Sequence, residues 1–149
     1  MKILITGASG FVGKNILEEI NSRENKLIAT APDRKILEAF IEQNNLKNIA
    51  IEELDITKPK ECDSIIKNVD IVIHLAALIN IGISLDDPRK TSKINYNGTL
   101  NILEAMRRNN IKKIIFSSTQ DIYGNNINGK EDEVEKIDPM NMYSLSKLF

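Results

Sequence analysis

The feature that most constrains the fold is a set of three glycines between a short apolar run and an amphipathic stretch. Residues 2–6 read Lys-Ile-Leu-Ile-Thr, and Gly7, Gly10 and Gly13 follow as apolar residues begin to recur at helical spacing. We therefore predict a strand over residues 2–6 and a helix over residues 11–20, joined by a tight turn. A strand that passes through a glycine-rich turn into a helix is the arrangement in which α/β proteins bind the phosphates of a dinucleotide.

Each glycine has a physical purpose in such a turn. Gly7 would permit the tight turn, Gly10 would let the backbone approach a pyrophosphate, and Gly13 would let the helix pack closely on the strand. The first helical amides, at Phe11 and Val12, would then point at the phosphates, whose charge the helix dipole favours. The spacing is G-x-x-G-x-x-G rather than the usual G-x-G-x-x-G, so the position of the turn carries the prediction. Three glycines in an ordinary turn are the alternative.

The rest of the chain alternates short apolar runs with longer amphipathic stretches. We expect strands over residues 2–6, 27–30, 49–54, 69–74 and 113–117, helices over 11–20, 33–43, 60–67, 87–109 and 141–149, and a long polar loop over 124–142. Several strands carry consecutive apolar residues, which is typical of strands covered on both faces. Strands that alternate with helices pair in parallel through right-handed crossovers, so the predicted fold class is α/β, a Rossmann-like doubly wound parallel sheet.

An acidic residue is expected near the end of the second strand, where it would hold the adenosine ribose. Ala31 directly follows that strand, and Asp33 and Arg34 lie at slightly greater reach. Asp33 could bond the ribose hydroxyls and favour NAD, whereas Arg34 could pair with a 2′-phosphate and favour NADP. Asp33 could equally cap the helix that begins after Pro32. The sequence leaves this choice open.

Six sequence blocks, in order, give the whole chain its resemblance to a known family. They are T-G-A-S-G-F-V-G from Thr6, Asp55-Ile56, H-L-A-A from His74, N-Y-N-G-T from Asn95, F-S-S-T-Q-D-I-Y-G from Phe116, and Y-S-L-S-K from Tyr143. The chain resembles the N-terminal portion of an extended short-chain dehydrogenase/reductase, the group of NAD(P)-dependent nucleotide-sugar epimerases, dehydratases and reductases. The resemblance implies NAD as cofactor, with NADP left open, and a nucleotide sugar as substrate.

The last two blocks imply the catalytic residues. Tyr143 and Lys147 are four residues apart and would share one face of the final predicted helix. Lys147, together with an oxidised nicotinamide, would stabilise the phenolate of Tyr143, which could then take a proton from a substrate hydroxyl while hydride leaves the same carbon. By resemblance, Lys147 also holds the nicotinamide ribose, and Thr119 hydrogen-bonds the reacting substrate oxygen. Ser118 is the rival of Thr119 for that role.

The residues after Thr119 bear on the type of reaction. Dehydratases of this family resemble Thr-Asp-Glu here and use the acids to eliminate water, whereas this sequence has Gln120 and Asp121. An epimerase, in which a transient ketone forms by hydride removal and is reduced again from the other face, is therefore the leading hypothesis. A dehydratase or reductase of the same family and a dinucleotide-binding module without catalysis are the alternatives. Asp121 could act on the substrate or simply belong to a loop.

The other blocks imply further contacts with the cofactor. By resemblance, the Asp55-Ile56 pair lies at the adenine, although Asp55 could instead cap the segment that follows Thr57. Small or apolar residues, Leu75, Ala76 and Ala77, would let the cofactor pass closely after the fourth strand. Asn95 would orient the backbone near the active site, or would simply be a polar helix residue.

Two further side chains invite a catalytic interpretation. His74 is the one histidine of the sequence and ends a predicted buried strand, where we expect a hydrogen-bonded structural role because Tyr143 already supplies the base. Cys62 lies on a weakly predicted helix, and we expect it to be an inert thiol.

Composition restricts the class of protein. The 20 lysines and arginines balance 21 aspartates and glutamates, which argues against a protein that binds nucleic acid through a basic surface. One cysteine excludes an internal disulfide and a Cys-rich zinc site, and we expect no metal. The apolar run at the N-terminus is too short for a signal peptide or a membrane span, so we expect a cytoplasmic protein with no membrane partner.

Length gives the final expectation. The 149 residues suffice for one domain with a real core, and 42% of them are apolar, as in globular proteins. However, only two residues follow Lys147, whereas members of the family continue into further strands and a C-terminal substrate domain. We therefore expect residues 1–149 to form an incomplete NAD(P)-binding Rossmann domain with little or no turnover. By resemblance, we expect a homodimer through the helix beginning near Pro88 and the helix of Tyr143.

Overall fold

The computed structural model describes residues 1–21, 24–124 and 136–148, and within them five strands form one parallel sheet. The strands are β1 (Lys2–Thr6), β2 (Lys26–Ala31), β3 (Ile49–Glu53), β4 (Ile71–His74) and β5 (Ile114–Phe116), in the spatial order β3-β2-β1-β4-β5. The predicted Rossmann-like α/β fold is therefore confirmed, and all five strands are found within three residues of their predicted bounds.

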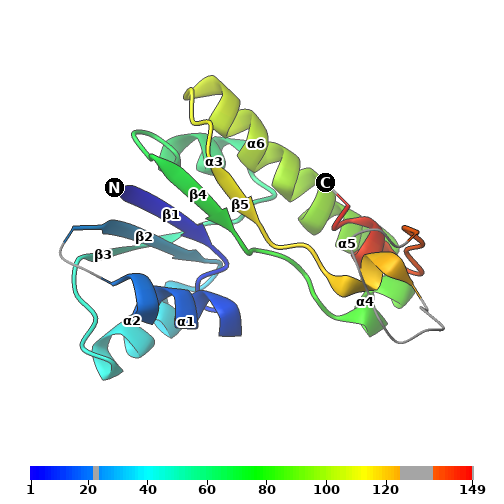
Figure 1. The fold of residues 1–149 in the computed structure, drawn as a ribbon, viewed down its shortest axis with the longest axis horizontal. Coiled ribbons are helices and arrows are strands. Elements are labelled where there is room, and N and C mark those ends of the chain that lie inside the picture. The colour runs from blue at the N-terminus through cyan, green and yellow to red at the C-terminus, as the bar shows by residue number, and fades with distance from the viewer. Residues whose placement is uncertain (22–23, 125–135, 149) are drawn as a thin grey trace.

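Helices cover both faces of the sheet (Figure 1). They are α1 (Phe11–Ile20), α2 (Arg34–Gln43), α3 (Pro59–Ile65), α4 (Ile81–Asp86), α5 (Pro88–Ser92), the π-helical turn η1 (Lys93–Asn97), α6 (Gly98–Arg108), the 3₁₀ turn η2 (Gln120–Tyr123) and α7 (Met142–Leu145). Figure 1 shows α1 and α2 on one face of the sheet and α3 and α6 on the other. None of these helices is long and apolar enough to cross a membrane.

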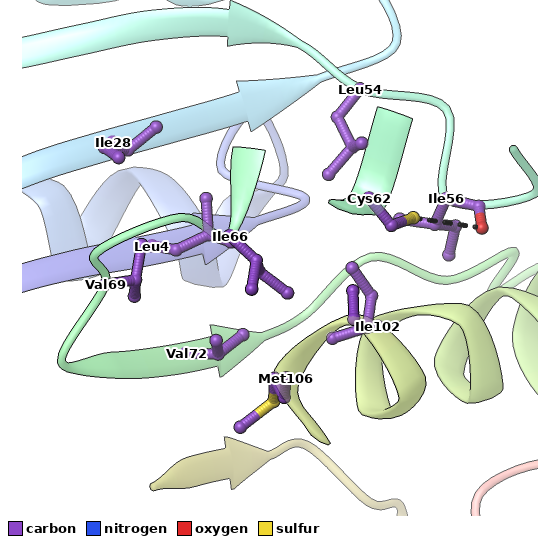
Figure 2. Close-up of a cluster of buried hydrophobic side chains, with 11 residues drawn as sticks. Leu4, Ile28, Leu54, Ile56, Cys62, Ile66, Val69, Val72, Ile102 and Met106 are labelled. Carbon is purple, nitrogen blue, oxygen red and sulfur yellow. Dashed lines mark hydrogen bonds between the residues drawn. The ribbon is translucent and has the colours of Figure 1, made fainter. Parts of the chain in front are cut away.

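Two apolar clusters, one on each face, hold the layers together. On one face, Leu17 of α1 and Leu37 of α2 pack on the side chains of β1 and β2. On the other face, Ile66 and Ile102 meet Leu4 and Val72 of the sheet, and Figure 2 shows these side chains converging between the strands and the helices. Burial on both faces explains why β1 and β2 read as continuous apolar runs rather than as alternating patterns.

Three parts of the chain differ from the sequence-based expectation. The helix predicted over 87–109 is a continuous run of α5, η1 and α6, widened by the π-helical turn around Asn95. Helix α4, which begins at the Asn80 cap, was not predicted. The helix predicted over 141–149 ends at Leu145, because Lys147 N–H donates to the Ser144 carbonyl three residues back, at 3.1 Å, and tightens the last turn. Residues 125–135 of the predicted loop and residue 149 lie outside the described residues.

The sheet order places a crevice at the carboxyl ends of β1 and β4. The chain runs from β1 to β2 on one side and returns across the sheet from β3 to β4 on the other, so the strand order reverses between β1 and β4. Thr6 pairs with Thr30 on one neighbour and with His74 on the other, so these three strand ends lie level. Ligands of open α/β sheets bind at such a reversal point.

Candidate functional site

The glycine turn is built as tightly as the sequence predicts. Gly7 has a φ of 68°, a conformation that favours glycine, and a Cβ added there would lie 2.6 Å from the Ala76 amide nitrogen. A Cβ on Gly13 would lie 2.6 Å from Cα of Ala8, so this glycine lets α1 pack directly on the turn. The first turn of α1 therefore starts at the crevice, with the segment after β4 against it.

A cavity of about 950 Å³ lies at this crevice. Among the residues predicted from the sequence to bind cofactor or to act in catalysis, those that line it are Gly7, Gly10, Phe11, Val12, Gly13, Asp55, Ile56, Leu75, Ala76, Ala77, Tyr143 and Lys147. They come from four separate segments of the chain, and the fold brings all four to one space. Four predicted residues, Asp33, Arg34, Asn95 and Thr119, do not line it.

The end of β2 shows what Asp33 and Arg34 do instead. Asp33 Oδ1 accepts the Lys35 N–H at 2.9 Å and caps α2, which is the alternative that the sequence left open. Arg34 Nε donates to Glu38 at 2.7 Å on the exposed surface of the same helix. Ala31 and Pro32 line the cavity in their place. The interpretation of Asp33 and Arg34 as cavity residues is therefore not supported by their positions.

Asp55 lies at the far end of the cavity, after β3. Its Oδ1 accepts the backbone N–H of Thr57 at 2.9 Å and the Thr57 hydroxyl at 2.7 Å. The Thr57 side-chain bond and then the backbone bond hold the pKa of the Asp55 carboxyl below its usual range, so the group is charged at neutral pH. Asp55 therefore fixes the local turn and faces the cavity at the same time.

Tyr143 and Lys147 reach the cavity from the opposite side. Asn141 caps α7: its Oδ1 accepts the Ser144 N–H at 2.8 Å, while the Ser144 hydroxyl accepts the Asn141 N–H at 3.2 Å. Helix α7 covers only one turn, so Tyr143 is helical and Lys147 lies in the turn that follows. The two side chains thus line the cavity without sharing a continuous helix face, and this corrects the predicted geometry.

Lys147 is a buried cation. Its side chain is only 4% exposed, Nζ donates to the Ser117 carbonyl at 3.1 Å, and Nζ lies 4.9 Å from the centre of the Phe116 ring. Burial lowers the pKa of the Lys147 amine from 10.5 to about 8. The amine therefore stays mostly protonated at neutral pH, and Lys147 brings a positive charge to the wall of the cavity.

The segment after β5 places Ser117, rather than Thr119, at the cavity. Ser117 and Asp121 line it, while the Thr119 hydroxyl accepts the Asp121 N–H at 3.3 Å and caps η2. The rival Ser118 donates its hydroxyl to the Lys147 carbonyl at 2.8 Å, which ties this segment to α7. Ser117 was not predicted, because the strand expected over 113–117 included it, whereas β5 ends at Phe116 and leaves Ser117 just beyond the strand end, where ligands lie.

Asn95 and His74 lie behind the cavity wall. The Asn95 side chain accepts the Leu78 N–H at 2.7 Å and donates to the Leu78 carbonyl at 3.1 Å, so it orients the backbone near the site, as the resemblance implied. His74 is fully buried with both ring nitrogens hydrogen-bonded, and burial, with a smaller effect of Lys147, lowers the pKa of its imidazole to about 4. This geometry agrees with a structural role for His74.

Cys62 is buried in the core, and its Sγ lies 3.6 Å from the Ile56 carbonyl (Figure 2). Burial raises the pKa of the thiol to about 11, which agrees with the expected inert character. In the described part of the chain, no three His, Cys, Asp or Glu side chains are grouped so that they could hold a metal ion.

Comparison with known proteins finds similar sequences along almost the whole chain. The family model described as "NAD dependent epimerase/dehydratase family" matches residues 3–149. A UDP-glucose 4-epimerase of Pisum sativum is 31% identical over 99% of this chain and 45% of its own length. A putative UDP-glucose 4-epimerase of Methanocaldococcus jannaschii is 38% identical over 97% of this chain and 47% of its own length.

Solved structures also match this chain over almost its whole length. The UDP-Glc/GlcNAc 4-epimerase of Campylobacter jejuni superposes with a TM-score of 0.89 at 25% identity, over 99% of this chain and 46% of its own. The UDP-glucose 4-epimerase of Bifidobacterium longum in complex with NAD⁺ and UDP has a TM-score of 0.89 at 27% identity, with the same coverage of 99% and 46%. The chain thus spans about half the length of the relatives that it matches.

Proposed function

This chain belongs to the NAD-dependent epimerase/dehydratase family, and on that premise we propose that it is the cofactor-binding part of a nucleotide-sugar epimerase. The observation that carries the proposal is the single cavity at the reversal point of the sheet, which receives both the glycine turn and the Tyr143–Lys147 segment. One set of residues suits a dinucleotide and the other suits proton transfer. Their meeting in one space is what an enzyme of this family needs.

The residues that line the cavity fit NAD. The contact between Gly7 and the Ala76 backbone leaves no room for a side chain, so the turn can bring its amides close to a pyrophosphate. Helix α1 begins at that turn and has no acidic residue in its first turn, so its amino end favours an anion. Two of the similar solved structures, from Bifidobacterium longum and Thermus thermophilus, are complexes with NAD, which supports NAD over NADP.

NAD, when bound, supplies a hydride acceptor. The remaining chemistry belongs to the chain: the Tyr143 phenolate takes the proton from a sugar hydroxyl, the resulting tyrosine hydroxyl returns it, and the Lys147 charge stabilises the tyrosine oxygen while it is negative. Lys147 also holds the nicotinamide ribose in this proposal. Thr119 contributes a hydrogen bond to the reacting sugar oxygen once substrate fills the site, since its hydroxyl accepts the Asp121 N–H as the cap of η2 and still has its own hydrogen to donate.

An epimerase is favoured over a dehydratase. Gln120 occupies the position where the resemblance to dehydratases requires an acid, and an amide cannot donate or accept the proton that elimination of water involves. The similar proteins from Pisum sativum and Campylobacter jejuni are named as 4-epimerases of UDP-sugars. We therefore infer a UDP-sugar as the substrate class.

The direct test is calorimetric titration of the 149-residue chain with NAD⁺. Val12 is exposed and lines the cavity, so Val12→Glu should fold normally while a carboxylate at the proposed phosphate site weakens NAD binding by about tenfold or more. Leu100→Glu places the same charge on an exposed position of α6 outside the cavity and should leave binding unchanged. Absence of NAD binding by the wild-type chain, or equal binding by both variants, would refute the proposed cofactor site.

Turnover is tested separately, by incubating the chain with NAD⁺ and UDP-glucose and measuring UDP-galactose. Because the chain spans about half the length of its relatives, we expect binding without appreciable turnover. Robust turnover would contradict that expectation, and it should then disappear in Tyr143→Phe while NAD binding persists. Turnover that survives Tyr143→Phe would remove the assigned acid/base.

A further inference from the structure

Behind the cavity wall lies a row of buried polar side chains that the proposed chemistry does not use. Thr6 Oγ1 lies 2.6 Å from His74 Nδ1, and His74 Nε2 lies 3.0 Å from Thr99 Oγ1. All three side chains are buried. The Thr6 hydroxyl also accepts the Ala76 N–H at 3.2 Å, so the row begins at the cavity floor, where Ala76 contacts the glycine turn.

The hydrogen-bond partners fix the direction of every bond in this row. The Thr99 hydroxyl lies 2.6 Å from the Asn95 carbonyl, which can only accept, so Thr99 donates there and must accept from His74 Nε2–H. The imidazole is neutral, because burial lowers its pKa to about 4, so Nδ1 carries no proton and accepts from the Thr6 hydroxyl. His74 is thereby held as the Nε2–H tautomer.

The same row continues through Asn95 to the peptide of Tyr143. Asn95 Nδ2 donates to Ser146 Oγ at 3.0 Å, and the Ser146 hydroxyl donates to the Tyr143 carbonyl at 2.7 Å. The Tyr143 N–H is held from the other side by the hydroxyl of Ser84, at 3.1 Å. Buried side chains therefore hold Tyr143 at both ends of its backbone.

Every polar group of this row has a hydrogen-bond partner, so the row forms a rigid connection. In the described residues, no buried side-chain nitrogen or oxygen lacks a hydrogen-bond partner. Helix α7 is a single turn and has little stability of its own, so its position depends on such tertiary bonds. Loss of the Thr99 hydroxyl would leave the buried His74 Nε2 without its partner, which is unfavourable.

We propose that His74 and Thr99 are positioning residues, which through Asn95 and Ser146 fix Tyr143 relative to the cavity floor at Ala76. The inference rests on the proposed function only in taking Tyr143 as the acid/base. Neither His74 nor Thr99 lines the cavity, so neither touches substrate or cofactor. Their effect is to hold the proposed acid/base at one distance from the glycine turn.

The first test is the ¹⁵N NMR spectrum of the imidazole in the 149-residue chain. His74 is the one histidine of the sequence, so the ring signals belong to it, and the couplings of each nitrogen to the ring carbon-bound protons distinguish Nδ1 from Nε2. We expect a neutral ring with the proton on Nε2 at pH 7. A protonated ring, or a neutral ring with the proton on Nδ1, would overturn the proposed direction of the row.

The second test compares two buried threonines, of which one contacts His74. Thr99 and Thr91 are both buried, and each hydroxyl donates to the carbonyl four residues earlier, but only Thr99 contacts His74. In Thr99→Val, amide hydrogen exchange at Leu78 and Tyr143 should be about tenfold faster than in Thr91→Val, as expected for the loss of one buried hydrogen bond. The tautomer should change only in Thr99→Val, and Thr99→Ser, which keeps the hydroxyl, should restore both readouts.

Equal exchange in the two valine variants would show that Thr99 acts only on general stability and would overturn the proposal. Should Thr99→Val fail to fold, Ser146→Ala provides the test, because it should speed exchange at Tyr143 about tenfold and leave the His74 tautomer as in the wild type. No change at Tyr143 in that variant would equally overturn the proposal. None of these measurements involves NAD, so a chain that passes them and binds no NAD refutes the proposed function alone.

Discussion

Replacing Lys147 with methionine should make the fold more stable at neutral pH while removing the proposed contact with the cofactor ribose. Lys147 is 4% exposed, and its ammonium donates to the Ser117 carbonyl at 3.1 Å. Among the described residues, no carboxylate lies within ion-pair distance of it. Methionine has a similar length and no charge, so it should fill the same space against Phe116.

The size of the effect follows from the Lys147 pKa. A fall in this pKa from 10.5 to about 8 corresponds to a penalty of about 3 kcal/mol on the protonated amine in the folded state. Methionine also loses the hydrogen bond to Ser117, which contributes about 1 kcal/mol. The net gain in the free energy of unfolding should be about 2 kcal/mol at pH 7, or about 4–8 °C in Tm for a chain of this size.

The pH dependence gives the reasoning its sharpest check. Below about pH 8 the lysine is protonated in both the folded and the unfolded chain, so the penalty is fully present. Between pH 8 and 10.5 the unfolded chain binds a proton that the folded chain does not, so the wild type gains stability as the pH rises. The advantage of Lys147→Met should therefore shrink to less than about 1 kcal/mol at pH 9.5.

Urea unfolding at pH 7 and pH 9.5 measures both quantities. Lys112→Met is the control, because Lys112 is exposed and the same substitution there should change stability by no more than about 0.5 kcal/mol. A Lys147→Met variant that is less stable than the wild type at pH 7, or one whose advantage is the same at both pH values, would refute the argument. A gain in stability together with a loss of NAD binding would show that Lys147 serves cofactor binding and lowers the stability of the folded chain.

Three further perturbations test other parts of the structure. Gly7→Ala should lower stability by about 2 kcal/mol or more and weaken NAD binding, because φ at Gly7 is positive and the added Cβ would lie 2.6 Å from the Ala76 backbone. Gly10→Ala is the control: its Cβ would lie 3.3 Å from the nearest atom, so thermal unfolding should show a change in stability of less than about 1 kcal/mol. As the pH falls from 6.5 to about 4, His74 becomes protonated in the unfolded chain but stays neutral in the folded chain, so stability should fall by up to about 3 kcal/mol. Urea unfolding over this pH range should show that this contribution is absent in His74→Gln. Cys62 should react with a disulfide reagent at pH 8 at least about a hundredfold more slowly in the native chain than in urea, since its thiol is buried with a pKa of about 11, and equal rates would contradict this burial.

The positions of the strands and the glycine turn were predictable because they depend on local order along the chain. Apolar runs such as residues 2–6 form strands wherever both faces are covered, and Gly7 and Gly13 lie where a side chain would meet backbone. The resemblance to a known family added the residues that face the cavity after β3 and β4. These predictions needed only the spacing of residue types and the rule that parallel strands end at one edge.

The sequence could not decide the partner of a side chain for which two partners were available. Asp33 could reach a ribose or cap α2, and it caps α2, because the Lys35 amide lies two residues away and costs little entropy to bind. Thr119 similarly caps η2 through the nearby Asp121 amide, and Ser117 takes the position at the cavity. A hydrogen bond to a partner nearby in the chain costs less entropy than one to a distant partner, and sequence spacing alone does not show which partner is present.

The sequence by itself determined the order of the elements, the parallel sheet and the glycine turn at the sheet edge, since each follows from residues close together in the chain. Only the tertiary structure decided that Lys147 is buried, that Tyr143 is held at both ends of its backbone, and that His74 reaches Tyr143 through Thr99 and Asn95. The physical reason is that the long-range hydrogen bonds of these groups join residues from 25 to 59 positions apart. The periodicity of a sequence reports which face of an element is apolar, whereas the partner that a buried polar group meets is fixed only when the elements pack.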